Sequence, residues 1–277
     1  SEDGSGLTRC PRNWGKVMLH RLKNGKLFGQ ELELDASLTS LQAKSTIVVS
    51  ELPPTSVADA SEEDVLKQSR DTEKVLDVAS RSPKAALMLL ASEIEKQLRI
   101  FMAITGHHSR MKDKSPATIA SYLGKVGWLT SAMVDTIQGF REVRNKIVHG
   151  TDDVSTDHIL RAIDSGMTIL KALEAIPCEI NIVYHPGVEV FTNKDCRENI
   201  EGVKGLILET TSPGGTTKSH RIYPTTRTNY EKGRQVAWEW NMSRILGNAW
   251  YRDPDTKEIR EAWGSSAEFV GRHIEEL

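Results

Sequence analysis

Arg144, Asn145 and His149 are the residues whose types and spacing point to a chemical function. A guanidinium can hold phosphate oxygens with its planar fork and stabilise negative charge that grows in a transition state. An imidazole transfers protons near neutral pH, and a position at a helix C-terminus favours its protonated form. With an amide to orient the phosphate or the imidazole, the set suits metal-independent cleavage of RNA, in which the ribose 2'-OH attacks the adjacent phosphate.

These residues belong to the segment Ile137 to Gly150, IQGFREVRNKIVHG, which is predicted to be an amphipathic helix. Its apolar residues recur at helical spacing. They are Phe140, Val143, Ile147 and Val148. Gly150 is expected to end the helix in a left-handed conformation, which other residues adopt only at a cost.

The order of arginine, polar residue, three further residues and histidine resembles the Arg-polar-x3-His motif of HEPN domains. These are helical bundles found in many prokaryotic toxins, defence proteins and RNA-processing enzymes. The motif lies at the end of a predicted helix in an all-helical tract, as the family requires. The resemblance implies an endoribonuclease in stress or phage defence, with Arg144, Asn145 and His149 as catalytic residues, and it calls for no metal or cofactor.

The motif residues do not converge on a single straight helix. At about 100° per residue, Arg144 and His149 diverge by roughly 140°, whereas Arg141, Asn145 and His149 stack on one face. Either the last turn is distorted or, as the resemblance implies, two bundles pair through their motif helices as a homodimer. Arg141 and Lys146, beside the motif, are candidate RNA-binding residues.

A non-catalytic interpretation is also open. Arg144 could pair with a neighbouring acid, and Asn145 and His149 could tie the helix end to a loop. Many domains of this kind are non-catalytic, so the alternative is a dimerisation or sensor module that binds a protein or nucleic-acid partner.

Composition sets the bounds for both interpretations. The chain has 277 residues, 38% hydrophobic and 27% charged, with a formal net charge of -2. Two modest domains fit this length, and any contact with RNA must come from a local basic patch. The three cysteines, Cys10, Cys178 and Cys196, are widely spaced and form no CxxC pair. This pattern indicates neither a disulfide framework nor a zinc site, and it favours a cytoplasmic location.

The first 60 residues are predicted to be an N-terminal arm or linker. Asn24-Gly25 and the alternation of residues 31–34 suggest a hairpin, and residues 46–50 suggest a short strand or extended arm. The stretch KLFGQELELD resembles the juxtamembrane segment of some bacterial membrane-anchored helical proteins. No apolar run is long enough for a membrane span, but the chain begins SEDGSG without Met, so an upstream anchor is left open.

Residues 61–177 are predicted to form the HEPN-like antiparallel bundle, with helix starts near Ser61, Ser82, Ser115, Thr130 and Ser155. Two of these starts place a proline directly after the serine, which favours the first turn of a helix. The core face of the second helix is expected to consist of Leu87, Leu90, Ile94, Leu98, Phe101 and Met102. His107 and His108 are interpreted as solvated residues at a helix end, because no second ligand pair accompanies them.

Residues 178–277 are predicted to form a small α+β domain with a mainly antiparallel sheet and a recognition or sensor role. Residues 179–184 and 188–191 are expected to flank a turn, and 203–210 to be a further strand. Alternating Val236, Trp238, Trp240 and Met242 predict another strand, residues 250–252 and 259–263 a hairpin, and Ser265 with Glu268 the start of a last helix.

Basic and aromatic residues alternate between positions 218 and 234. Such residues together can grip phosphates and stack on bases. The candidate RNA-binding residues in this stretch are Lys218, Arg221, Arg227, Tyr230 and Arg234. The frequent Gly, Thr and Pro favour the alternative of a mobile surface loop.

Overall fold

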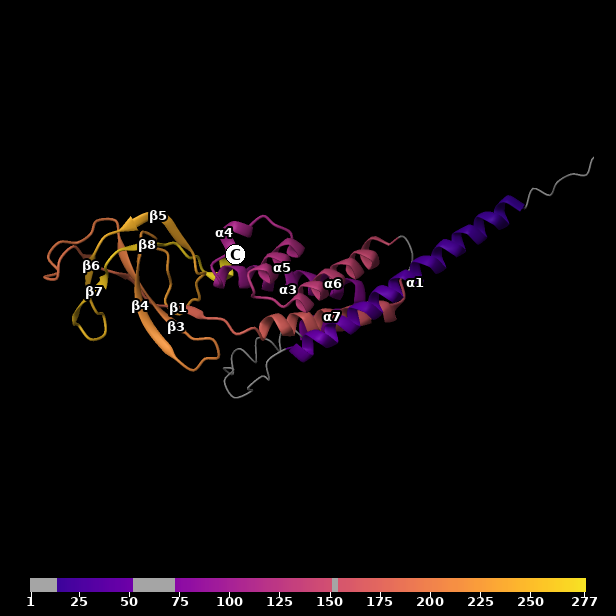
Figure 1. Cartoon of the computed structure of the whole chain (residues 1–277), viewed down its shortest axis with the longest axis horizontal. Helices are drawn as coiled ribbons and strands as arrows, with labels where there is room; N and C mark the ends of the chain where they lie inside the picture. The colour runs from indigo at the N-terminus through magenta and orange to yellow at the C-terminus, as the bar shows by residue number, and fades with distance from the viewer. Residues whose placement is uncertain (1–13, 52–72, 151–153) are drawn as a thin grey trace, which may run out of the picture.

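The chain forms a helical bundle followed by a domain of antiparallel strands, so its fold class is α+β, as the sequence predicts (Figure 1). The computed structural model describes residues 14–51, 73–150 and 154–277, with side chains described from residue 31 onward in the first range. The helices are α1 (Trp14–Glu51), α3 (Pro83–Ile104), α4 (His108–Met111), α5 (Pro116–Lys125), α6 (Ser131–His149) and α7 (Thr156–Glu174), and residues 73–81 are also helical. The expected helix start at Ser61 lies outside the described residues.

Hydroxyl side chains begin four of the helices, as predicted. Each of these side chains accepts a hydrogen bond from the backbone N–H three residues ahead. They are Ser82 at the start of α3, Ser115 at the start of α5, Thr130 at the start of α6 and Ser155 at the start of α7. This contact satisfies one of the N–H groups that a helix start leaves without a partner.

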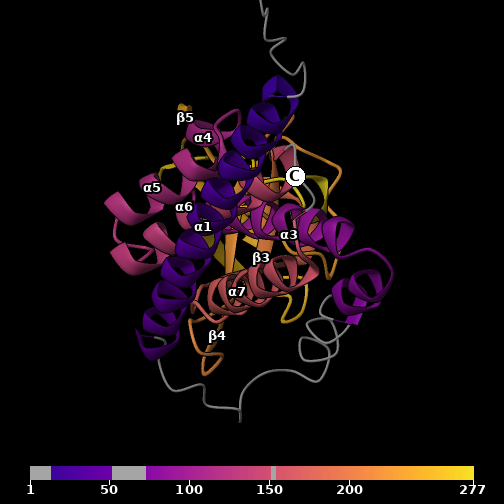
Figure 2. The ribbon, with the colours of Figure 1, turned by 90° about the vertical axis from the view of Figure 1, so that its right-hand side faces the viewer.

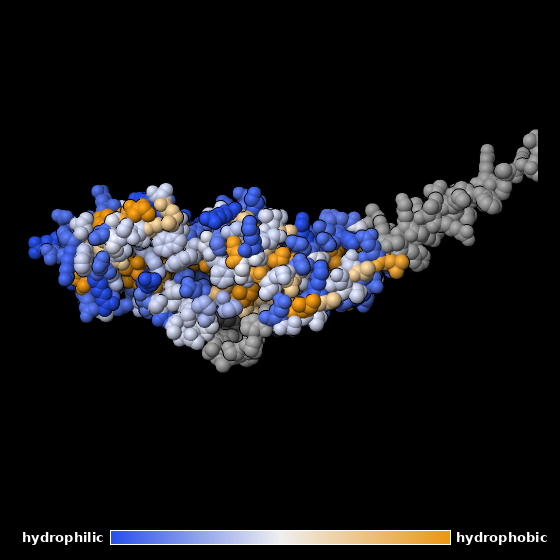
Figure 3. Space-filling view, in the orientation of Figure 1, coloured by the Kyte–Doolittle hydropathy of each residue, from blue (hydrophilic) through white to orange (hydrophobic). Residues whose placement is uncertain are grey.

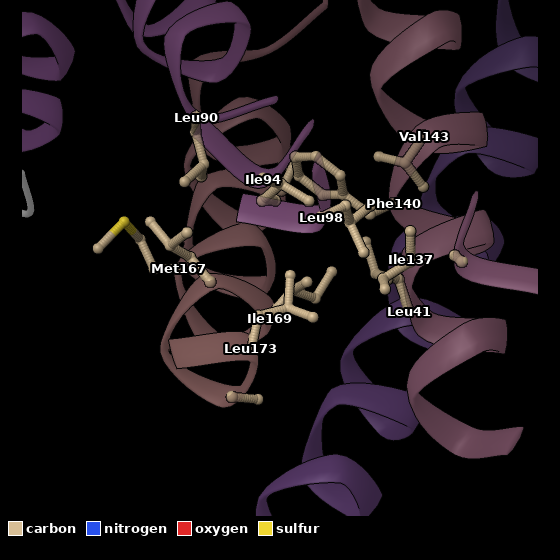
Figure 4. Packing of buried hydrophobic residues seen from close by; sticks show 14 of the residues in the cluster. Leu41, Leu90, Ile94, Leu98, Ile137, Phe140, Val143, Met167, Ile169 and Leu173 are labelled. Atoms are coloured by element: carbon tan, nitrogen blue, oxygen red, sulfur yellow. The ribbon is translucent and has the colours of Figure 1, made fainter. Parts of the chain in front are cut away.

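The core of the bundle lies between α1, α3, α6 and α7 (Figure 4). All six apolar residues predicted for the core face of α3 are buried. Figure 4 shows Leu90 and Ile94 of α3 approaching Phe140 of α6 and Met167 of α7. Burial of such side chains stabilises each helix pair by excluding water from apolar surface.

The N-terminal hairpin and the strand near residues 46–50 were wrong predictions, because α1 is a continuous helix through both. Its residues Leu34, Leu38, Leu41 and Val48 are buried in the bundle core. Their spacings of four, three and seven residues place them on one face of α1, which packs against α6 and α7. The helix also continues through the turn signal of Asn24-Gly25. Figures 1 and 2 show α1 running along these helices, with its N-terminal part extending beyond them.

Antiparallel pairing organises the C-terminal domain. Its elements are β1 (Ile180–Val188), β2 (Val190–Phe191), β3 (Lys204–Thr211), β4 (Lys218–Thr225), β5 (Trp240–Leu246), β6 (Ala249–Arg252), β7 (Ile259–Trp263), β8 (Ser266–Phe269) and the 3-10 helix η1 (Ile274–Glu276). The strands are ordered β1-β3-β4, β2-β6-β7 and β5-β8 in three sheets. The predicted strand near 203–210 and the hairpin of β6 and β7 are confirmed.

Several local predictions in this domain were wrong. Residues 185–187 belong to β1, which continues past them with bulges against β3, so they do not form a hairpin turn between β1 and β2. Val236 and Trp238 precede β5, and their backbone N–H groups bond to Asn181 and Ala103. Instead of opening a helix, Glu268 lies in β8.

Glu268 also shows why the expected last helix does not form. Its side chain is buried and accepts hydrogen bonds from Thr226 and from Asn241. Burial raises the pKa of this carboxyl, but the hydrogen bonds from Thr226 and Asn241 outweigh burial and the net pKa is lowered. A buried carboxylate needs such donors, and in β8 it reaches them while pairing with β5.

The bundle and the strand domain meet at the end of α3. The backbone N–H of Trp238 donates to the carbonyl of Ala103 across 2.9 Å. Gly106 lies against the same tryptophan with φ of +79°, and an added Cβ would come within 3.1 Å of the Trp238 carbonyl oxygen. The close approach and the left-handed backbone both require glycine here.

Apolar side chains form small separate patches on the face seen in Figure 3. Leu32 of α1 and Met242 of β5 are among the exposed apolar residues. Within the described residues, no helix combines the length and apolar character needed to cross a membrane.

Candidate active site

Helix α6 presents the motif residues on its outer surface. Its inner face is buried and includes Ile137, Phe140, Val143 and Ile147. Arg141 and His149 are exposed, whereas Arg144 and Asn145 are half-buried. The apolar spacing that predicts the helix therefore also predicts which side chains reach solvent.

Gly150 ends α6, but not in the left-handed conformation that the sequence suggests. Its φ of -61° and ψ of 140° are extended values open to most residues. The reason for glycine is space, because a Cβ at this position would lie 2.6 Å from the carbonyl oxygen of Lys146. That oxygen accepts the Gly150 N–H, and this hydrogen bond closes the last turn beside His149.

Arg144 and Asn145 are joined through their side chains. Nη1 of Arg144 donates to Oδ1 of Asn145 across 2.8 Å. Nε of Arg144 is buried and has no hydrogen-bond partner among the described residues. A buried guanidinium N–H without an acceptor is costly, and Nε of Arg144 carries this cost in the structure.

A groove runs between α3, α5 and α6 beside these two residues. It has a volume of about 260 Å³. We call it the motif groove, and its lining residues are Ala91, Ile94, Glu95, Pro116, Ala117, Ile137, Phe140, Arg141, Arg144 and Asn145. Two arginines therefore face one small concave surface.

The charge in the motif groove is mainly positive. Among the described residues, Glu95 is the one carboxylate that lines it, and its Oε1 already accepts from Nη2 of Arg99 across 2.9 Å. In the described part of the chain, Arg141 and Arg144 form no ion pair with any carboxylate. Two arginines without counter-charges attract phosphate, which accepts hydrogen bonds from guanidinium groups in a bidentate way.

His149 does not join Arg144 within one chain. No hydrogen bond links it to Arg144 or Asn145, although all three residues are described. The helix between them is regular to its last residue, so the distorted last turn that could have brought them together is absent from this described segment. The divergence of roughly 140° expected from helix geometry therefore holds.

Lys146 points to α1 and away from the motif groove. Its Nζ lies 2.7 Å from Oε1 of Glu33 and 3.1 Å from Oγ of Ser37. The hydrogen bond and the charge of Lys146 hold the pKa of Glu33 below its usual value. His158 also faces α1, 3.7 Å from Asp35. Lys146 thus links α6 to α1 through an ion pair, although the sequence suggests it as an RNA-binding residue.

The basic stretch of the C-terminal domain is partly engaged in ion pairs. Lys218 pairs with Glu209 at 2.8 Å. Arg234 lies within ion-pair distance of Glu231, Glu275 and Glu276. The expected mobile loop is wrong for its first half, which forms β4 in register with β3.

Tyr230 is not available for base stacking, which corrects its assignment as an RNA-binding residue. Only 7% of its surface is exposed, and its ring packs with Phe269 in the core of the domain. Burial raises the pKa of Tyr230 to about 12. Arg221 is exposed on β4 and Arg227 is half-buried, and no described contact joins either residue to the motif groove.

His107 and His108 differ from the solvated pair that the sequence suggests. Nδ1 of His107 lies 3.2 Å from the Tyr122 hydroxyl, and His108 is buried with 6% exposure between the bundle and the strand domain. Burial lowers the pKa of both imidazoles. Among the described residues, no group of three or more His, Cys, Asp or Glu side chains is placed to hold a metal ion.

Glu95 is the groove residue that the sequence does not single out. It follows the buried Ile94 on α3 and is far in the sequence from the motif. A carboxylate on the polar side of a predicted helix carries no signal by itself. Only the packing of α3 against α6 brings it to the groove.

The chain was compared with protein-family models, with curated proteins and with solved structures, and none of the three comparisons found a match.

Proposed function

We propose that the chain is a metal-independent endoribonuclease of the HEPN type that acts as a homodimer. The observation that supports this best is the pairing of Arg144 with Asn145 on the wall of a positively charged groove. The motif resemblance adds the class of substrate, RNA, and a role in stress or phage defence. A local groove of this kind meets the need for a phosphate site in a chain with a net charge of -2.

In this proposal Arg144 binds the scissile phosphate and Asn145 fixes the direction of the guanidinium fork. The 2'-OH gives its proton to the imidazole of the second copy's His149 and attacks phosphorus, and the bond to the 5'-oxygen breaks. That oxygen takes a proton from the solvent. The products are a 2',3'-cyclic phosphate and a 5'-hydroxyl, and Arg144 stabilises the charge of the transition state.

The second copy is needed because one chain keeps Arg144 and His149 apart. Arg141 and His149 are exposed on one strip of α6 and Asn145 between them is half-buried, so a second α6 can approach this strip. Across a two-fold axis each groove then receives the His149 of the other copy.

A non-catalytic dimerisation or sensor module is the alternative. The same separation of Arg144 and His149 favours it, because a bundle that merely dimerises needs no assembled site. Its partner would be a protein or a nucleic acid bound through the strand domain.

Cleavage of mixed RNA in EDTA separates the two proposals. The wild-type chain should release fragments with cyclic phosphate ends, and Arg144→Ala and His149→Ala should each lower the rate by about 10²- to 10⁴-fold. Matched controls are Arg81→Ala, an exposed arginine on another helix, and His220→Ala in β4. Equal loss in the controls, or cleavage that survives both motif variants, would count against the nuclease. A folded dimer without any cleavage would support the alternative.

A further inference from the structure

The motif groove extends beyond the phosphate-binding residues. Its floor is formed by buried apolar side chains, including Ile94, Ile137 and Phe140, and its rim by Pro116 and Ala117 of α5. A flat ring can cover such a surface, because a base that leaves the stack of an RNA strand gains apolar contact in return. The groove thus offers room for one nucleobase next to the phosphate at Arg144.

Glu95 lies at this groove with one side chain oxygen already used. Its Oε1 accepts from Arg99, and Arg99 in turn donates to the carbonyl oxygens of Lys112 and Lys114. The loop after α4 therefore fixes the arginine, and the arginine fixes the carboxylate. Oε2 of Glu95 has no hydrogen bond to any described residue.

A fixed carboxylate selects among bases by what it can accept. Ionised carboxylates donate no hydrogen bond, and each oxygen accepts more than one. Guanine has two adjacent donors, N1–H and the N2 amino group, on its Watson–Crick edge, whereas each of the other three bases offers a donor on one ring position or amino group. Guanine alone can therefore donate to both oxygens of Glu95.

We infer that the motif groove binds guanine and that Glu95 is the residue that determines this specificity. The inference rests on the proposed function, since it treats the groove as the RNA site of that activity. Arg144 holds the phosphate, the apolar floor holds the ring, and Glu95 reads its Watson–Crick edge. Asn145 uses its Oδ1 to accept from Arg144, which leaves its amide N–H₂ group as a donor to the RNA.

Binding of uncleavable RNA tests the inference separately from catalysis. Fluorescent pentamers with 2'-fluoro sugars and G, A, C or U between flanking uridines are titrated with the full chain. The guanine pentamer should bind about ten-fold more tightly or better than the other three. A pentamer with hypoxanthine, which lacks the N2 amino group, should fall between guanine and adenine.

The variant Glu95→Gln should reduce the guanine preference to about two-fold or less, because an amide presents one acceptor and one donor. Glu93→Gln is the matched control, since Glu93 lies on the same helix and pairs with Lys96 outside the groove. Arg99→Gln should lower the preference only in part, because it leaves the carboxylate of Glu95 but removes the contact that fixes it. Equal binding of all four pentamers, no binding of any, or an unchanged preference in a folded Glu95→Gln chain overturns the inference.

The two proposals fail in different ways. A guanine preference without cleavage of ordinary RNA removes the nuclease and keeps the base site. Cleavage that depends on Arg144 and His149 but shows no preference for guanine at the cut keeps the nuclease and removes the role of Glu95.

Discussion

Arg144 donates to the side chain of Asn145, the residue that follows it, across 2.8 Å, and both line the motif groove. Successive residues of a helix point about 100° apart, so this contact requires the guanidinium to bend toward its neighbour. The bend leaves the other N–H groups of the fork for a ligand. In the proposed function, Asn145 therefore acts on a phosphate through Arg144, as a positioning residue.

Asn145→Ala should weaken RNA binding without unfolding the chain. The variant removes the acceptor that orients Arg144, and a hydrogen bond to a charged group contributes about 1.5 to 3 kcal/mol, less where solvent reaches it. We expect the affinity for an uncleavable oligonucleotide to fall about ten-fold. Anisotropy titration measures this fall, and thermal unfolding checks the fold. Gln138 lies on the same helix as Asn145 and contacts Ser121 of α5, so Gln138→Ala is the control and should bind normally. An unchanged affinity for Asn145→Ala would remove its positioning role.

The starts of four helices were predictable because each depends on one hydroxyl residue and the few residues after it. The apolar face of α3 was predictable for a similar reason, since burial repeats with the helix period. Arg144 and Asn145 were proposed as site residues from their types, their spacing and the motif resemblance. Their place on the outer side of α6 follows from the apolar face of the same helix.

Contacts between distant segments were not predictable in this way. The segment around Asn24 and Gly25 has a local turn signal, but Leu38 and Leu41 join the bundle core, and the helix continues through the signal. From the sequence, Glu268 predicts a capped helix start. In the structure it lies in β8, where its carboxylate accepts hydrogen bonds from Thr226 and Asn241. Glu95 reaches the motif groove only because α3 packs against α6, and no short-range pattern marks this position.

Gly166 and Gly139 should respond in opposite ways to replacement by alanine. A Cβ at Gly166 of α7 would lie 2.6 Å from both Leu90 Cδ2 and Phe140 Cε2, so the contact of three helices has no room for a methyl group. Such overpacking costs about 1 to 3 kcal/mol. A Cβ at Gly139 of α6 would meet Leu41 at an ordinary 3.6 Å, and alanine favours a helix by about 1 kcal/mol over glycine.

Urea unfolding of the two variants measures both effects. The midpoint should fall for Gly166→Ala and rise for Gly139→Ala, with similar slopes of free energy against urea in each case. A stabilised Gly166→Ala chain would mean that α3, α6 and α7 do not pack as closely as described.

The stability of the chain should fall as the pH drops from 7.5 to about 5, and His108 should account for much of the change. Burial lowers the pKa of this imidazole from its ordinary value near 6.5, and the nearby charges of Arg272, Lys112 and Arg99 act in the same direction, against Glu239. The unfolded chain then binds more protons than the folded chain below that value. Stability is fully present above pH 6.5 and is lost as the pH falls toward the folded-state pKa.

His108→Leu should flatten this dependence in urea unfolding at several pH values. His107 has a lowered pKa as well, so a smaller slope should remain. Four carboxyl groups have pKa values below their usual values near 4, so they affect stability only at lower pH. They belong to Glu33, Glu209, Asp253 and Glu268. An identical pH profile in wild type and His108→Leu would show that folding does not shift the pKa of this imidazole.

Mixed dimers should reveal whether Arg144 and His149 of different copies form one site. In a heterodimer of Arg144→Ala and His149→Ala, one site keeps both residues and the other loses both. Random exchange of equal amounts makes about half of the dimers mixed, so about a quarter of wild-type cleavage should return although each variant alone is inactive. A mixture of Arg144→Ala with the double variant contains no Arg144 and should stay inactive. If heterodimers isolated with two affinity tags still cleave no RNA, the two residues do not act across the two-fold axis. They do not act within one chain either, because the regular helix between them keeps them apart.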